Sequence, residues 1–224
     1  MADIVVFAPT RPGDESLAQA RWIAERNILA LQEVPRSCVC VVDDQAHRQN
    51  LEKALATESE GVAFFGHGRL EQSGALMGAD GLPALDRDNI TLLRGRWVHA
   101  FACSLGSTEL PVLVAENDAR CFAAYRTAIY FAWRATDIPA AIRADLEALV
   151  SSTTVLLARG VRDIVELKAA AQRHADSIEN WCIEQPDDVN ILPWVVFVQS
   201  LASLTLALPA QTDANRTKTG DSPS

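Results

Sequence analysis

Positive charge is scarce in this sequence of 224 residues, which has 20 Lys and Arg against 29 Asp and Glu and a net charge of −9. Binding to phosphate backbones depends on clustered Lys and Arg, and no segment of the chain gathers them. The composition therefore argues against a protein that binds nucleic acid directly. Basic peptide segments are more natural partners for a chain of this charge.

The pattern of a secretory leader or a membrane span is also missing. The first residues have neither a charged n-region nor a long apolar stretch, and the five cysteines are odd in number. The most apolar segment, 191–208, is interrupted by Pro193 and by four polar residues. A bilayer span needs roughly 20 predominantly apolar residues. We expect a buried strand and a following packed segment there, no membrane contact, and a location in a reducing cytoplasm.

Motifs for phosphate or metal cofactors are not present either. Gly66-x-Gly68 lacks the third glycine and the Lys-Ser/Thr pair of a phosphate-binding loop. Cys38-x-Cys40 differs from the usual Cys-x-x-Cys zinc spacing, and alternate residues of a buried strand do not converge readily on a third ligand. We expect no cofactor and no metal.

Short apolar runs alternate with helical patterns through the first half of the chain. Runs at 4–8, 38–42, 62–65 and 97–102 predict buried strands, and amphipathic patterns at 14–32 and 45–57 predict helices between the first three. This alternation, with continuous apolar strands, is typical of a parallel sheet covered on both faces. Further elements are expected as a hairpin or irregular excursion at 74–83, a short helix from Asp86 or Asp88 to 93, helices at 109–116, 140–157 and 161–181, and strands at 120–125 and 194–198.

The composition is that of one ordinary globular domain. Hydrophobic residues make up 49% of the chain and charged residues 22%, and no shift in composition divides it. We therefore expect one α/β domain over residues 1–208, with a mostly parallel central sheet of about six strands. Residues 209–224 contain no large hydrophobic side chain and are expected to form a disordered polar tail.

Two residues with catalytic chemistry follow consecutive predicted strands. His67 lies between Gly66 and Gly68 directly after the third strand, and Cys103 follows the fourth. The carboxyl ends of parallel strands meet at one edge of a sheet, where helix N-termini gather. A thiolate there is stabilised, and a neighbouring imidazole can take up its proton near neutral pH. We expect Cys103 as nucleophile and His67 as general base, with the N–H groups of Cys103 and Gly68 forming an oxyanion pocket.

Three segments carry a resemblance to a known family. Residues 64–68 are Phe-Phe-Gly-His-Gly, residues 80–82 are Asp-Gly-Leu, and residues 98–106 are Val-His-Ala-Phe-Ala-Cys-Ser-Leu-Gly. Together they resemble the CHAT domain, a caspase-like branch of the clan that also contains caspases, separases and gingipains. The resemblance continues at 156–171 and at 192–198, which is similar to the closing strand of the family.

The resemblance implies a caspase-like three-layer sandwich and a cysteine endopeptidase that cleaves a protein substrate through His67 and Cys103. It also implies activation by a regulatory protein partner or a signal, in bacterial antiviral defence or regulated cell death. The chain departs from the family pattern at 104–106, directly after Cys103, and at 118–121, before the fifth strand. These departures concern the substrate pocket more than the dyad.

In caspase-like sheets, the side chain before the scissile bond is received by the loop after the first strand and by loops that follow the cysteine strand. In the first of these loops, Arg11 could hold an acidic side chain and Asp14 a basic one, although Asp14 also fits the cap of the following helix. Glu116 and Asp118 are expected to add negative charge from the loop after the cysteine helix. Together with the acidic net charge, they favour a basic or neutral residue at the cleavage site.

Two other functions use the same residues. A degenerate caspase-like domain would bind a partner and cleave nothing, although an intact His67 and Cys103 favour the enzyme. The dyad could also serve an acyl-transfer enzyme that acts on a small molecule. Outside the dyad, His99 is expected in the core or at the sheet end, and the four other cysteines lie in apolar segments where thiolate formation is disfavoured.

Overall fold

A six-stranded sheet forms the centre of the molecule. The computed structural model describes residues 3–71, 73–131, 133–185 and 191–209. The strands of the sheet are β1 (Asp3–Pro9), β2 (Cys38–Asp43), β3 (Ser59–Phe65), β7 (Trp97–Phe101), β8 (Cys121–Tyr125) and β9 (Leu204–Ala207). Their order is β2-β1-β3-β7-β8-β9, and all neighbours pair in parallel except β8 and β9, which are antiparallel. The predicted mostly parallel sheet of about six strands is confirmed.

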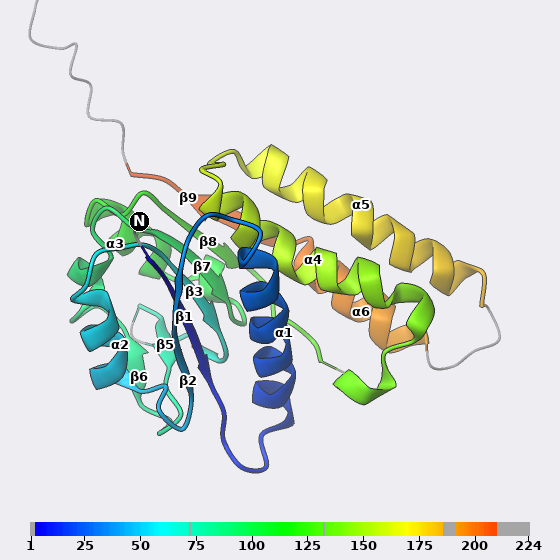
Figure 1. Cartoon of the computed structure of the whole chain (residues 1–224), viewed down its shortest axis with the longest axis horizontal. Coiled ribbons are helices and arrows are strands. Elements are labelled where there is room, and N and C mark those ends of the chain that lie inside the picture. Colours follow the sequence, from blue (N-terminus) through cyan, green and yellow to red (C-terminus); the bar gives the residue numbers. More distant parts are fainter. Residues whose placement is uncertain (1–2, 72, 132, 186–190, 210–224) are drawn as a thin grey trace, which may run out of the picture.

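Helices cover both faces of this sheet (Figure 1). One face carries α1 (Glu15–Leu31), α4 (Ala140–Ala158), α5 (Ile164–Ile183) and α6 (Leu192–Leu201), and the other carries α2 (Arg48–Leu55), α3 (Leu110–Glu116) and the 3₁₀ helix η1 (Ile90–Leu93). Side chains of β1 alternate between the two layers, because successive residues of a strand point to opposite faces. Ile4 and Val6 pack with the first group, and Val5 and Phe7 pack with the second. The fold is the predicted three-layer α/β sandwich.

A small antiparallel sheet follows the end of β3. It consists of β4 (Gly68–Arg69), β5 (Ala75–Met77) and β6 (Pro83–Leu85), which confirms the hairpin predicted at 74–83. Two further 3₁₀ helices complete the connections, η2 (Leu105–Ser107) directly after β7 and η3 (Ala135–Asp137) before α4. The short helix predicted to end at residue 93 is the 3₁₀ helix η1.

The strand predicted at 194–198 is wrong, because this segment lies within helix α6. Its buried side chains Trp194, Phe197, Val198 and Leu201 recur at intervals of three and four residues, which places them on one face of a helix. Pro193 lies in the first turn, where the missing N–H costs no helical hydrogen bond. The sixth strand comes directly afterwards as β9, so the order expected for this apolar segment is reversed.

The polar tail predicted at 209–224 lies, apart from Pro209, outside the described residues. The extent of the domain over 1–208 stays a prediction. Within the described ranges, no helix combines the length and the apolar character that crossing a bilayer requires.

Candidate active site

The ends of β3 and β7 bring His67 and Cys103 to one cavity. The two strands pair in parallel up to Phe65 and Phe101, and the Gly66 N–H then donates to the Phe101 carbonyl at 3.1 Å. His67 and Cys103 follow directly, and both line a cavity of about 40 Å³. This geometry agrees with the expectation that the two strand ends place these side chains at the same edge of the sheet.

Gly68 allows the two loops to approach each other closely. A Cβ atom at this position would lie 2.5 Å from the Cys103 carbonyl oxygen and 2.7 Å from Leu105 Cγ. Both distances are well below van der Waals contact, so a side chain at residue 68 would push the loop of Cys103 away. The glycine after His67 is therefore required by packing.

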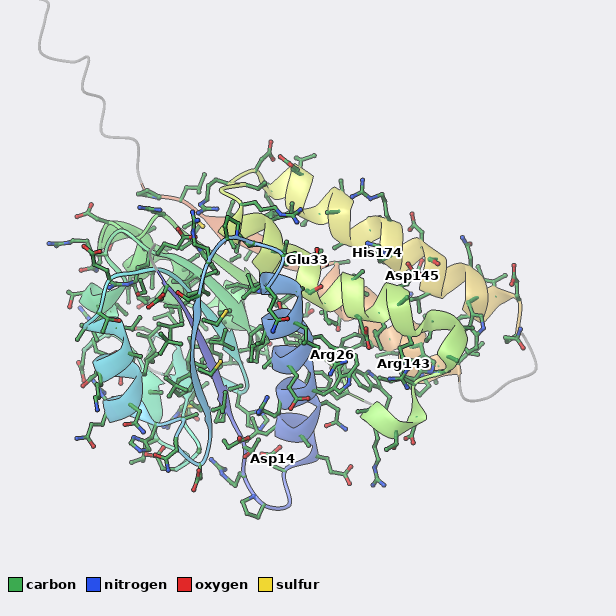
Figure 2. All side chains as sticks on the ribbon, viewed as in Figure 1. Asp14, Arg26, Glu33, Arg143, Asp145 and His174 are labelled. Atoms are coloured by element: carbon green, nitrogen blue, oxygen red, sulfur yellow. The ribbon has the colours of Figure 1, made fainter. Side chains whose placement is uncertain are left out.

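Asp14 binds the imidazole of His67. Its Oδ2 lies 2.8 Å from His67 Nε2, and its Oδ1 accepts the Leu17 N–H at 3.1 Å as the N-cap of α1. Burial opposes ionisation of this carboxyl, but its hydrogen bonds with His67 and the Leu17 N–H outweigh that effect and lower the pKa of Asp14. Figure 2 shows Asp14 at the start of α1, where the loop from β1 enters the helix.

The contact with Asp14 fixes which nitrogen of His67 can act as a base. An ionised carboxylate only accepts hydrogen bonds, so in the neutral imidazole Nε2 carries the proton and Nδ1 keeps its lone pair. The sequence predicts Asp14 in the substrate pocket or at a helix cap and gives no direct sign of its contact with His67. The available signal was an acidic residue in the loop after β1, which ends at the same edge of the sheet as β3.

The sulfur of Cys103 contacts the loop after β8. Cys103 Sγ accepts the Ile129 N–H at 3.3 Å and lies 3.7 Å from the Ile129 carbonyl oxygen. The next residue, Ser104, has a left-handed backbone with φ of 55°, and its N–H donates to the Thr127 carbonyl at 2.9 Å. A non-glycine residue in this conformation costs roughly 1–2 kcal/mol. The loop after β8 therefore holds both Cys103 and the strained residue after it.

The two N–H groups proposed for the oxyanion pocket come from different elements: Gly68 belongs to β4, and Cys103 follows β7. Gly68 faces Leu76 in the register of β4 and β5, while Met77 donates to the His67 carbonyl at 3.1 Å. Hydrogen-bonded and non-hydrogen-bonded pairs alternate in an antiparallel ladder, so the Gly68 N–H points away from β5. Cys103 lies beyond the end of β7. Their joint action on an oxyanion stays a prediction.

The structure separates the four residues predicted for the substrate pocket. Asp14 binds His67, and Arg11 donates through Nε to the Ala79 carbonyl at 3.3 Å. Glu116 and Asp118 lie before β8, at the start of the strand, where the Gly95 N–H donates to the Asp118 carbonyl at 2.9 Å. This is the amino edge of the parallel sheet, opposite the edge that carries Cys103. Glu116 and Asp118 therefore do not line a pocket beside Cys103.

The cavity beside Cys103 is lined by other residues, which were not predicted from the sequence. Ser16 from the start of α1, Phe101 from β7, and Ile129 and Phe131 from the loop after β8 complete it. Their signal was weak, because a short apolar segment after a strand resembles the core-forming segments elsewhere in the chain. Their position at the carboxyl edge follows from the topology once β8 is placed beside β7.

His99 and three of the other cysteines lie outside the candidate site. His99 is fully buried, its Nδ1 lies 2.8 Å from Thr154 Oγ1, and burial lowers its pKa to about 3. This confirms the core position expected for His99. Burial raises the pKa of the Cys38 and Cys121 thiols to about 11, and it also raises the pKa of Cys40. Cys40 is exposed on the edge strand β2, contrary to the expectation of an apolar environment.

A solved structure shares this fold. Comparison with known protein families finds no match, and comparison with characterised protein sequences finds none either. Among solved structures, the Arg-specific cysteine proteinase gingipain R (RgpB) superposes with a TM-score of 0.50 at 10% identity, over 92% of this chain and 46% of the other. The chain thus spans slightly less than half the length of that proteinase. It has the caspase-like fold that gingipain R represents, and its membership of the CHAT branch stays a prediction.

Proposed function

We propose that this chain is a cysteine endopeptidase of the CHAT type, with Cys103 as nucleophile and His67 as general base. The observation that carries the proposal is one cavity lined by both residues, with Asp14 bound to Nε2 of the imidazole. A carboxylate that orients a histidine beside a nucleophile is the arrangement that acyl transfer requires. The fold shared with a cysteine proteinase supports the same reaction class.

In the proposed reaction, His67 Nδ1 takes the proton of the Cys103 thiol, and Sγ bonds to the carbonyl carbon of the scissile peptide. The N–H groups of Gly68 and Cys103 stabilise the negative charge that develops on the carbonyl oxygen. The C–N bond then breaks, and His67 gives its proton to the leaving amine. Water adds to the thioester and transfers a proton to His67. The C–S bond breaks, the carboxylic acid leaves, and the thiol is restored.

We further propose that this activity is switched on by a protein partner or another signal. In the described part of the chain, the hydrogen bonds of Cys103 Sγ are made with Ile129 rather than with His67. Catalytic hydrogen bonds are often long or poorly aligned before substrate binds, so this geometry fits a resting peptidase. The resemblance to the CHAT domain supports a role in bacterial defence or regulated cell death.

The same contact supports a second candidate, a silent caspase-like module that binds a partner protein. If Cys103 Sγ kept its hydrogen bonds with Ile129 in every state, instead of turning toward His67, the thiol would not react. The two candidates differ in whether any state of the protein makes Cys103 react with a peptide electrophile.

Labelling with a peptidyl acyloxymethyl ketone that carries a neutral residue next to the reactive group tests the proposal. We expect one covalent adduct on Cys103, found by peptide mass spectrometry, in the protein alone or after co-expression with its genetic neighbours. Cys103→Ala should abolish the adduct, and Cys40→Ala should retain it, because Cys40 is the exposed thiol away from the site. No adduct in either state would favour the silent module. If the adduct forms, proteins cut by the wild type and not by Cys103→Ala identify the substrate.

A further inference from the structure

The cavity beside Cys103 has uncharged walls. Apart from His67 and Cys103 themselves, its lining residues within the described ranges are Ser16, Gly66, Phe101, Ala102, Ile129 and Phe131. None of these side chains can form an ion pair. A charged side chain that enters such a cavity loses its hydration without gaining a partner, which costs several kcal/mol in proteins. The walls therefore disfavour Asp, Glu, Lys and Arg.

The charged side chains of the nearby loop are already engaged. Asp14 uses one oxygen for His67 and the other for the Leu17 N–H. Arg11 donates to the Ala79 carbonyl, and Glu15 forms an ion pair with Arg134 at 2.7 Å. Recruiting Asp14 or Glu15 to a substrate would break an existing contact, and Arg11 does not belong to the cavity lining. The loop after β1 thus offers no ready counter-charge to a residue bound beside Cys103.

The cavity is also small and firmly walled. Its volume is about 40 Å³, enough for a few water molecules or one small side-chain group, since one water molecule needs roughly 10–15 Å³ in the same measure. The ring of Phe131 lies 6.2 Å from that of Phe101, 5.7 Å from that of Phe197 and 6.0 Å from that of Trp133. Because this wall belongs to a packed aromatic cluster, enlarging the cavity requires a shift of several rings.

We infer that Cys103 acts on peptides with glycine, alanine or serine immediately before the scissile bond, with Ile129 and Phe131 as the residues that set this specificity. The inference rests on the proposed function and narrows the basic-or-neutral preference expected from the sequence. One methyl or hydroxymethyl group fits the available volume, and the peptide backbone remains outside. A larger side chain would have to displace Ile129 or Phe131.

Rates of covalent labelling of Cys103 in the full chain test this inference. A set of peptidyl acyloxymethyl ketones is used that differ only in the residue next to the reactive group, which is Gly, Ala, Leu, Asp or Lys. We expect the Gly and Ala probes to react at least about ten-fold faster than the Leu, Asp and Lys probes. Fastest labelling by the Asp or Lys probe would overturn the inference and leave the proposed peptidase intact. If iodoacetamide modifies Cys103 but no peptide probe does, the proposed function itself fails.

Two matched substitutions assign the specificity to the cavity wall. Ile129→Ala enlarges the cavity and should raise the rate with the Leu probe relative to the Ala probe by about ten-fold. Ile138→Ala removes an equally buried isoleucine, 5% exposed like Ile129, from the same hydrophobic cluster outside the cavity lining. It should leave the ratio unchanged. An equal change in both variants would attribute the preference to general loosening of the core and would contradict the role of Ile129. Should Ile129→Ala fail to fold, Ile129→Val carries the test with a smaller expected change in the same direction.

Discussion

Asp14 Oδ2 lies 2.8 Å from His67 Nε2, which ties the loop after β1 to the loop after β3. The contact joins residues that are far apart in sequence but adjacent in the sheet, since β1 and β3 pair in parallel. It gives the candidate base a defined tautomer and a fixed ring orientation.

Replacing Asp14 by Asn should lower kcat/KM by about ten- to hundred-fold, because an amide no longer holds the Nε2 proton as a carboxylate does. The pKa of Asp14 is lowered in the folded chain, so its contribution to stability is present above its unfolded pKa of about 3.9. That contribution is lost as the pH falls through the folded-state value. The stability difference between wild type and Asp14→Asn in chemical denaturation should therefore shrink below about pH 4. Glu15→Gln, at the neighbouring exposed carboxylate, is the control and should leave kcat/KM unchanged.

Replacing His67 by Ala should abolish turnover and leave folding nearly unchanged. The side chain is 39% exposed, and its loss removes one hydrogen bond, worth about 1 kcal/mol. His174→Ala is a matched control, because His174 binds Asp145 at 2.9 Å between α4 and α5, away from Asp14 (Figure 2). Its loss should cost similar stability and no activity. Global unfolding of His67→Ala would instead assign this residue a structural role.

Cys103 should be the first thiol alkylated by a limiting dose of iodoacetamide near neutral pH. Thiols with a pKa of about 11, such as Cys38 and Cys121, are almost entirely protonated under these conditions. The exposed Cys40 is the strongest competitor, although burial of its sulfur raises its pKa as well. Peptide mass spectrometry gives the order directly. Modification of Cys40 ahead of Cys103 would remove a main support for the proposed nucleophile.

Replacing Gly68 by Ala should reduce both stability and activity. Its Cβ would lie 2.5 Å from the Cys103 carbonyl oxygen, and overpacking of this kind typically costs about 1–3 kcal/mol. Gly95→Ala is the control, because that position has free space around it but a φ of +71°. It should cost about 1 kcal/mol through the backbone alone and leave activity unchanged. Full activity in Gly68→Ala would show that the two loops need not approach as closely as they do here.

Much of the fold follows from hydrophobic pattern alone. The buried runs that became β1, β2 and β3 are short, apolar and separated by clear helical periodicity, so their parallel pairing was predictable. The run that became β7 was predictable as a further buried strand. Segment 192–198 was misread because a continuous apolar run fits a buried strand and a buried helix equally well. The apolar pattern extends to Leu201, and its buried residues lie three and four positions apart, which favours the helix.

The candidate site was predictable only in part. His67 and Cys103 could be placed together because strand ends meet at one edge of a parallel sheet. Glu116 and Asp118 were misplaced because the loop that follows a crossover helix returns the chain to the opposite edge. Ile129 and Phe131 depend on how the loop after β8 folds back over Cys103, a tertiary contact that no local pattern specifies.

The double role of Asp14 makes one backbone amide a reporter on the site. The Leu17 N–H in the first turn of α1 is protected by Oδ1 of the same carboxylate that binds His67 through Oδ2. Hydrogen–deuterium exchange at this amide depends on how firmly the carboxylate is held, since local opening of a helix end needs little free energy. A ligand that changes the charge on His67 therefore alters the exchange rate of Leu17, and binding at the cavity can be followed without measuring catalysis.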